Sequence, residues 1–189
     1  MFEPWIGSNY SENRVKPLVI GESRYDEEYT DRRIITARIA GEFRGGQRRT
    51  YTNFERAVLG QNCSDDDAQT FWHSVIFHNY NVNAFPGGPR VRLTRQQRED
   101  PENIRTLRRM VQDHRPTHAI VWGLTNWEYV ELEAGQRWID SIIPETVEPC
   151  CTATVDGHST LFTRIAHPSS GFSSKRWATA LTNFLALQP

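Results

Sequence analysis

Residues 18–25 read LVIGESRY, an apolar run that stops at a glycine and continues with a carboxylate, a hydroxyl, a guanidinium and a phenol. A short continuous apolar run bounded in this way is typical of a strand that is covered on both faces of a sheet. Similar runs follow at 74–77, 119–122 and 161–165. The pattern therefore predicts four buried strands, each of which ends in a polar segment.

Helical signals lie between these runs. The predicted capping residues are Thr52 with Glu55, Ser64 with Asp67, Asp100 with Pro101, and Ser173 or Ser174. Strands that alternate with helices predict an α/β sandwich around a mainly parallel sheet. Asp156-Gly157 also predicts a tight turn between strands at 150–155 and 159–165, which would form a hairpin.

Composition favours one soluble domain. The 189 residues are 38% hydrophobic, enough for a single core, so we expect residues 1–189 to fold as one domain and to act as a monomer. We expect a cytoplasmic protein without membrane contact, since no apolar run approaches the roughly 18 residues of a membrane span and the first residues do not resemble a signal peptide. Cys63, Cys150 and Cys151 are odd in number, and two are adjacent, so no disulfide framework is expected.

The charge pattern is compatible with a nucleic-acid partner without requiring one. The formal net charge is −1, yet all basic residues except Lys16 and Lys175 are arginines, and many of these cluster within 44–49 and 90–109. Arginine binds phosphate bidentately, although such runs are also common on solvated surfaces. The histidines and cysteines lack the spacing of a zinc or iron–sulfur site, so no metal or other cofactor is predicted.

The polar segments that follow the four apolar runs should meet, because ligands bind beyond the carboxyl ends of the strands in α/β sheets. These segments are GESRYDE (21–27), HNYNVN (78–83), GLTNWE (123–128) and HPSSGFSSKRW (167–177). They predict a catalytic or binding mouth.

Several residues in these segments have side chains suited to catalysis or recognition. Pro168 fixes the preceding His167 in an extended conformation, although a plain strand–turn–helix junction would look the same. Asn79 can offer a donor and an acceptor to the edge of a base, or else cap a turn. Glu22 and Asp26 can hold or activate water, or else form ion pairs with nearby arginines, namely Arg24, Arg32 or Arg33. The amides of Ser169 and Ser170 could hold a phosphate near Lys175 and Arg176.

Taken together and in this order, the segments resemble the uracil-DNA glycosylase superfamily over most of residues 15–187. LVIGESRY is similar to the family's first motif, and HPSSGFSS is similar to its second, the His-Pro-Ser loop. IFHNYNV (76–82) is similar to the strand that ends in a base-reading Asn, and RPTHAIVWGLTNWEYV (115–130) to the segment that precedes the second motif. The resemblance implies a three-layer sandwich with a central, mainly parallel four-stranded sheet flanked by helices.

The resemblance also implies an activity and a set of residue roles. The protein would be a monofunctional DNA glycosylase that flips a nucleotide and hydrolyses its N-glycosidic bond, leaving an abasic site. His167 would stabilise the departing base, Glu22 or Asp26 would position water, and Asn79 would read the base edge. The remaining implied contacts are Ser23 and Tyr25 in the pocket, Phe172 as the wedge, and Ser169, Ser170, Ser173, Lys175 and Arg176 on the DNA backbone.

Two departures from the family pattern bear on the substrate. Ser23 stands where the best-known branch has Asp, and Arg24 stands where it has Pro. We therefore expect a modified or damaged pyrimidine, such as the hypermodified cytosines of phage DNA, in which case the role would be anti-phage defence.

Three alternatives remain open at the level of sequence. The first is a uracil-DNA glycosylase of base excision repair. The second is a serine hydrolase with Ser23 as nucleophile and His167 or His158 as base. The third is a non-catalytic nucleic-acid-binding module.

Overall fold

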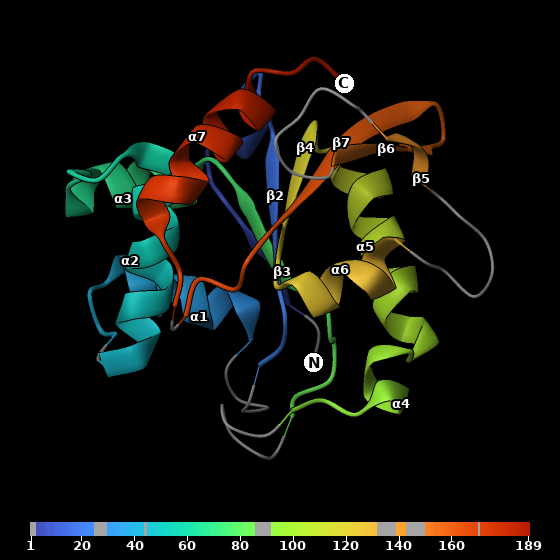
Figure 1. Ribbon diagram of the computed structural model, residues 1–189, viewed down its shortest axis with the longest axis horizontal. Helices are drawn as coiled ribbons and strands as arrows, with labels where there is room; N and C mark the ends of the chain where they lie inside the picture. The colour runs from blue at the N-terminus through green and yellow to red at the C-terminus, as the bar shows by residue number, and fades with distance from the viewer. Residues whose placement is uncertain are drawn as a thin grey trace.

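The computed structural model describes residues 3–24, 30–43, 45–85, 92–131, 139–142, 150–169 and 171–189. Within these ranges, one mixed sheet has seven strands in the order β1-β3-β2-β4-β7-β6-β5, and helices lie on both of its faces (Figure 1). The strands are β1 (Trp5–Ile6), β2 (Pro17–Gly21), β3 (Ile76–Asn79), β4 (His118–Trp122), β5 (Ile139–Ile142), β6 (Cys150–Val155) and β7 (His158–Ile165). The helices are α1 (Asp31–Ile39), α2 (Gly45–Leu59), α3 (Asp65–His73), α4 (Arg95–Arg98), α5 (Pro101–His114), α6 (Leu124–Glu131) and α7 (Ser174–Leu185), with a 3₁₀ turn, η1 (Tyr10–Glu12).

The α/β class is confirmed, and the four predicted apolar runs form the centre of the sheet. β3, β2, β4 and β7 are neighbours in this order and are mutually parallel. The expected number of four strands is too small, because β1, β6 and β5 add antiparallel strands at the two edges. β1 has only two residues, too few for a recognisable sequence pattern.

The predicted hairpin is also confirmed. β6 pairs antiparallel with β7, and Asp156 and Gly157 form the turn with φ angles of 47° and 73°. Two successive residues with positive φ are the feature that Asp-Gly hairpin turns provide.

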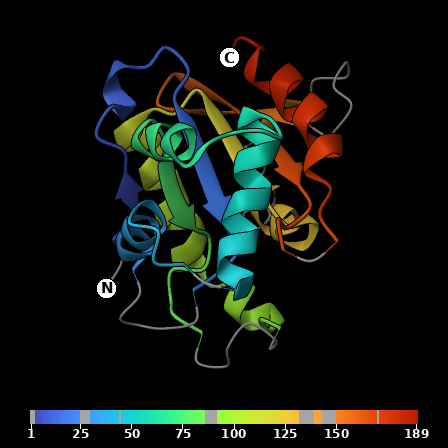
Figure 2. The same ribbon diagram turned by 90° about the vertical axis from the view of Figure 1, so that its left-hand side faces the viewer.

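The central strands are apolar throughout because each face of the sheet has its own hydrophobic core. Val19 faces the core beneath α1, α2, α3 and α7, whereas Leu18 and Ile20 face the core beneath α5 and α6. Figure 2 shows α2 and α7 side by side in front of the sheet. A strand covered on both faces needs apolar side chains at successive positions, which explains LVI in β2.

Three of the four predicted helix starts are confirmed. Ser64 and Asp67 form a complete capping box before α3. Asp100 caps α5, with Pro101 at its first position, and Ser173 caps α7.

The predicted start at Thr52 is wrong, because α2 begins at Gly45 and Thr52 lies inside it. Glu55 is 1% exposed and serves the core instead. Its carboxylate accepts two hydrogen bonds from Arg38, of 2.8 and 2.6 Å, and one from Trp72 Nε1 of 2.7 Å. Each acceptor oxygen of this buried carboxylate therefore has a donor, as burial requires.

None of the helices in the described ranges is long and apolar enough to span a membrane.

Candidate active site

The carboxyl ends of the four parallel strands lie together at one end of the sheet, at the lower side of Figure 1. Gly21 at the end of β2 is in register with Asn79 at the end of β3. The amide of Gly123, directly after β4, donates to Ile165 O of β7 at 2.9 Å, and Asn126 Nδ2 donates across to Gly21 O at 3.3 Å. We call this end of the sheet the mouth and define it by Gly21, Glu22, Ser23, Asn79, Gly123 and His167.

A glycine is required at position 21 because there is no room for a side chain, and not because the backbone angle is unusual. A Cβ atom added there would lie 2.3 Å from Asn79 Oδ1 and 3.0 Å from Phe77 Cζ. Both distances are shorter than van der Waals contact. The glycine in LVIGESRY therefore lets the amide of Asn79 lie directly against the backbone of β2.

Asn79 is the last residue of β3 and is held by a buried carboxylate from α1. Its backbone N donates to Asp31 Oδ2 at 2.9 Å, and its Nδ2 donates to Asp31 Oδ1 at 2.6 Å. Asn79 is 5% exposed and Asp31 is 3% exposed. The turn-capping alternative is therefore wrong: the amide is a fixed group within the sheet edge.

Glu22 is also anchored, but by a different residue from those expected. Its carboxylate lies 3.2 Å from Arg98 Nη1, an ion pair whose angle falls outside hydrogen-bond geometry. Its carbonyl oxygen accepts from the backbone N and the Nδ2 of Asn81, at 3.2 and 2.7 Å. Arg24 instead donates to Val82 O at 2.8 Å, and Arg32 pairs with Glu3 at 3.2 Å.

His167 follows β7 and packs against Trp122 at the end of β4. Its ring meets Trp122 edge to face, with centroids 5.9 Å apart and planes at 86°, and its Cβ lies 4.0 Å from the position of a Cβ added at Gly123. Burial lowers the pKa of His167, and the negative charge of Glu22 opposes that shift without cancelling it. Burial therefore favours the neutral form of the imidazole.

The loop that carries His167 is fixed from α2. Asn53 Nδ2 donates to Pro168 O at 2.9 Å and to Ser169 O at 3.4 Å. Phe172, the predicted wedge, is half-buried and stacks on Trp177 with centroids 6.2 Å apart and planes at 9°. Phe172 thus packs on the molecule's own core in this structure, and a wedge role would require it to leave Trp177.

The predicted backbone-binding residues lie around the start of α7. Ser173 Oγ accepts the amide of Arg176 at 3.3 Å, so it serves as the helix cap. Lys175 and Arg176 are exposed, with the Arg176 guanidinium 5.6 Å from the centroid of the Trp177 ring, and Ser169 is half-buried. Tyr25, Asp26 and Ser170 lie outside the described residues.

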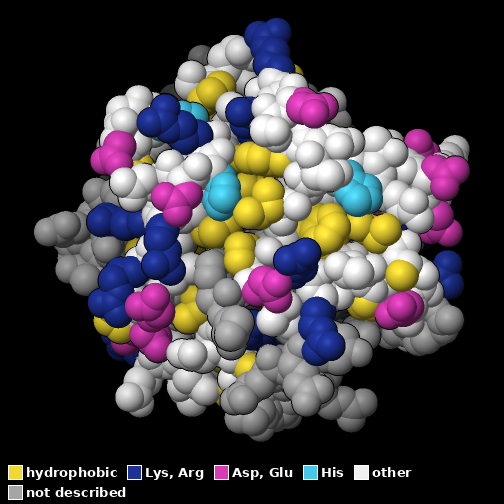
Figure 3. All heavy atoms as spheres, turned by 180° about the vertical axis from the view of Figure 1, so that it is seen from behind, with side chains coloured by type: hydrophobic (Ala, Val, Ile, Leu, Met, Phe, Trp, Pro, Cys, Tyr) yellow, Lys and Arg dark blue, Asp and Glu magenta, His cyan; other side chains and the backbone are white. Residues whose placement is uncertain are grey.

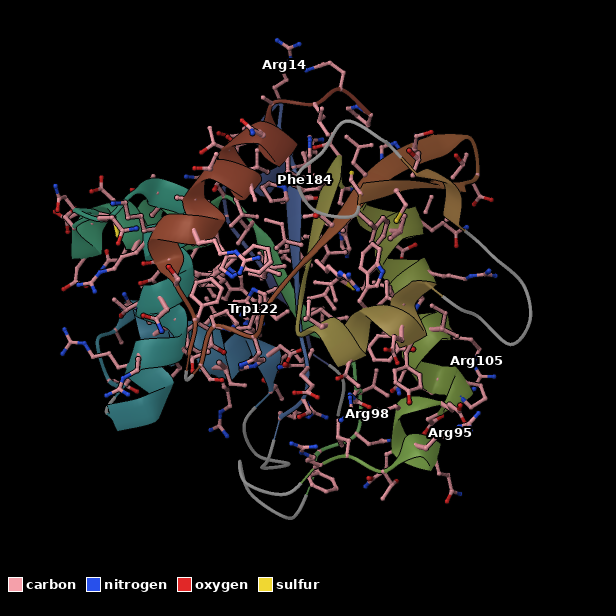
Figure 4. The ribbon with its side chains drawn as sticks, in the orientation of Figure 1. Arg14, Arg95, Arg98, Arg105, Trp122 and Phe184 are labelled. Atoms are coloured by element: carbon pink, nitrogen blue, oxygen red, sulfur yellow. The ribbon has the colours of Figure 1, made fainter. Side chains whose placement is uncertain are left out.

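Two arginines of the 90–109 cluster form ion pairs on the surface. Arg95 pairs with Glu99 at 2.7 Å, and Arg105 pairs with Glu102 at 2.8 Å. Figure 4 shows Arg95 and Arg105 directed outward, with Arg98 nearer the lower end of the sheet. Basic and acidic side chains are interspersed over the face seen in Figure 3. Arg95 and Arg105 thus belong to a solvated surface, whereas Arg98 reaches the mouth through its ion pair with Glu22.

Ser23 has no histidine base among the residues the structure describes. It is half-buried and makes no hydrogen bond to His167. The second candidate base, His158, lies at the opposite end of β7, where its Nε2 is 2.8 Å from Pro116 O. This geometry disfavours the serine hydrolase.

No group of three or more His, Cys, Asp or Glu side chains in the described ranges could hold a metal ion. Two surface hollows, of about 620 and about 240 Å³, lie outside the mouth. The first is lined by Arg95, Gln96, Glu99, Asp100 and Pro101, and the second by Arg38, Ile39, Ala40, Gly41, Phe43, Arg48, Asp65 and Gln69.

Sequence reasoning missed the residues that hold the mouth together. Asp31 stands next to two arginines, and Arg98 stands in a run of charges, so both look like surface residues. Neither has a local signal, because their partners, Asn79 and Glu22, are distant in the chain.

No protein-family model and no curated protein matches this sequence.

Proposed function

We propose that the protein is a monofunctional DNA glycosylase of the uracil-DNA glycosylase type, which hydrolyses the N-glycosidic bond of a flipped nucleotide. The observation that carries the proposal is that Asn79, Glu22 and His167 lie at the carboxyl ends of three strands, β3, β2 and β7, of one parallel group. Two of the three are held by charged partners from other elements, Asp31 and Arg98. A recognition amide, a carboxylate and a neutral imidazole are the groups that such a hydrolysis needs.

His167 would act on the leaving base. As the bond between C1′ and the base nitrogen breaks, the electron pair stays with the base and negative charge builds on its carbonyl oxygen. A neutral imidazole N–H aimed at that oxygen stabilises the charge, and a donor of this kind contributes about 10²–10³-fold in rate. Contact with Trp122 orients the ring, and burial favours its neutral form.

Glu22 would act on the sugar and on water. Loss of the base leaves positive charge on the sugar ring, which a nearby carboxylate stabilises. Water then adds its oxygen to C1′ and releases a proton, and the base leaves with a proton in place of the sugar bond. The ion pair with Arg98 fixes where the carboxylate lies, and Asp26 is the other residue expected to handle the water.

Asn79 would read the edge of the flipped base, while exposed residues at the start of α7, Ser173, Lys175 and Arg176, would contact the DNA backbone. The substrate we favour is a modified or damaged pyrimidine, because Ser23 and Arg24 depart from the family pattern. Arg24 is buried and donates to Val82 O at 2.8 Å, so the residue at this departure is a guanidinium packed inside the protein. Phage cytosines with large substituents would place the enzyme in anti-phage defence, and plain uracil would place it in base excision repair.

A panel of synthetic duplexes and single strands tests the proposal. The panel carries uracil, thymine, oxidised pyrimidines, and hydroxymethylated and glucosylated cytosines at one labelled position. The wild-type protein is expected to leave an alkali-labile abasic site with at least one of these bases. His167→Ala should lose that activity, whereas His114→Ala, at the far end of α5, should keep it. Absence of cleavage across the whole panel would reject the proposal.

A further inference from the structure

Asp31 is a buried carboxylate that the proposed mechanism does not use directly. It is the first residue of α1, where the helix dipole stabilises its charge, and the preceding Thr30 caps the helix through its hydroxyl at 3.3 Å from Arg33 N. Thr30 also donates to Glu3 Oε2 at 3.0 Å. The position of Asp31 is thus fixed by its own helix and by the N-terminal segment.

Both carboxylate oxygens of Asp31 are committed to β3. Oδ2 accepts the backbone N–H of Asn79 at 2.9 Å and lies 3.2 Å from His78 Nδ1. Oδ1 then faces Asn79 Nδ2 at 2.6 Å. The carboxylate cannot rotate without losing the backbone bond, so it always presents an acceptor to the amide of Asn79.

This contact fixes the orientation of the Asn79 amide. An amide has a donor and an acceptor end that are nearly equal in shape, and only its partners decide which end lies where. A flip by 180° would bring Oδ1 against the Asp31 carboxylate, two acceptors without a proton between them. In the observed orientation, Oδ1 lies against Gly21, and no donor from the described residues reaches it.

We propose that Asp31 is a positioning residue that fixes the orientation of the Asn79 amide. This orientation sets which pyrimidine edge Asn79 can pair with, and it thereby determines selectivity between 4-keto and 4-amino pyrimidines. A 4-keto pyrimidine offers an acceptor at position 4 and a donor at N3, and a 4-amino pyrimidine offers the reverse. An amide locked in one orientation pairs with only one of these orders. The inference rests on the proposed glycosylase function.

The test compares one pair of substrates that differ only at position 4. The first is the pyrimidine that the wild-type protein releases, and the second is the same base with the 4-keto and 4-amino groups exchanged. The ratio of the two kcat/KM values measures selectivity independently of how much protein is folded. Asp66→Asn, an exposed carboxylate on α3, serves as the matched control.

Asp31→Asn and Asp31→Ser place a neutral group opposite Asn79 that can either donate or accept. Both orientations of the Asn79 amide then have a partner, so the selectivity ratio is expected to fall by about tenfold or more in each variant. The control should keep the wild-type ratio.

Each other outcome overturns the inference in a distinguishable way. Slower release of both bases at an unchanged ratio would show a structural role for Asp31 and leave the glycosylase proposal intact. Loss of the thermal unfolding transition in both variants would show that Asp31 acts through stability alone. A wild-type protein that releases no base would overturn the proposed function and this inference together.

Discussion

Arg98 of α4 and Glu22, directly after β2, form an ion pair of 3.2 Å in which the side chains are only 10% and 28% exposed. Arg98 is further held by a 3.4 Å bond from its Nε to Leu93 O and lies 5.9 Å from the centroid of the Tyr129 ring. A short helix far from β2 in sequence thus fixes the carboxylate that the proposed mechanism uses.

Arg98→Met should therefore impair both folding and base release. The substitution leaves the Glu22 carboxylate without its cation, and we expect a loss of about 2 kcal/mol in the free energy of unfolding, less than for a fully buried pair because Glu22 is partly exposed. Denaturant melts measure that loss, and single-turnover rates measure base release.

Arg95→Met on the same helix is the matched control. Its ion pair with Glu99 has side chains that are 82% and 46% exposed, so solvent screens it and its loss should leave both the stability and the rate of base release unchanged. Equal effects of the two substitutions would contradict the anchoring role of Arg98.

Gly21→Ala should disturb the mouth by steric conflict. The new methyl group would meet Asn79 Oδ1 at 2.3 Å, and the amide cannot yield because Asp31 holds it. We expect a loss of about 1–3 kcal/mol in stability and a slower release of the base.

Gly60→Ala separates steric conflict from the general cost of replacing glycine. Gly60 has φ 106° and nothing within 4 Å of an added Cβ, so the change should cost about 1 kcal/mol through backbone strain alone. Base release per folded molecule should stay at the wild-type rate. A Gly21→Ala variant that behaves in the same way would argue against the close contact with Asn79.

His167 should titrate below its ordinary pKa of 6.5, because burial disfavours the imidazolium. Its ring resonances followed by NMR against pH measure this value directly. Glu22→Gln should lower the pKa further, since the negative charge of Glu22 raises it. A His167 pKa above 6.5, or an increase on Glu22→Gln, would contradict the geometry described for the mouth.

The same shift predicts the pH dependence of activity and stability. The rate of base release should stay constant from pH 8 down to the range of the ordinary histidine pKa. It should fall only at lower pH, because the neutral imidazole then becomes charged. Because the unfolded chain binds this proton more readily, the free energy of unfolding should also decrease as pH falls from 6.5 through the lowered pKa. A rate that rises with acidification would indicate that imidazolium is the active form.

Glu55→Gln should destabilise the fold without changing the chemistry. The substitution leaves the buried Arg38 with only its 3.6 Å contact to the exposed Asp65, and breaking a buried pair of this kind costs about 3 kcal/mol. Glu42→Gln, at an exposed loop position, is the control and should have little effect on melting. Base release per folded molecule should match the wild type in both variants, and a selective loss in Glu55→Gln would reveal an unexpected link to the mouth.

The sequence predicted the elements that depend on local patterns. The apolar runs of β2, β3, β4 and β7 and the Asp-Gly turn of the hairpin carry their structure in a few adjacent residues. The position of the mouth followed from them, because parallel strands place their carboxyl ends together.

The contacts that hold the mouth could not be predicted in the same way. Arg98 and Arg95 belong to the same short helix and look equivalent in sequence, yet one is buried against Glu22 and the other points to solvent. Glu55 resembled a capping residue because the spacing fits, and only the approach of Arg38 and Trp72 from other helices shows that it lies in the core. Tertiary approach decides these cases.

Isotope labelling distinguishes hydrolysis of an N-glycosidic bond by water at this mouth from other routes of base release. The reaction is run in water enriched in ¹⁸O on the DNA that gives abasic sites, and the products are weighed by mass spectrometry. Hydrolysis by water should give an intact free base without ¹⁸O, one ¹⁸O atom at C1′ of the abasic sugar, and no protein–DNA adduct after borohydride treatment. Base release that leaves C1′ unlabelled at the first turnover, or a trapped adduct at Lys175 or another amine, would contradict it.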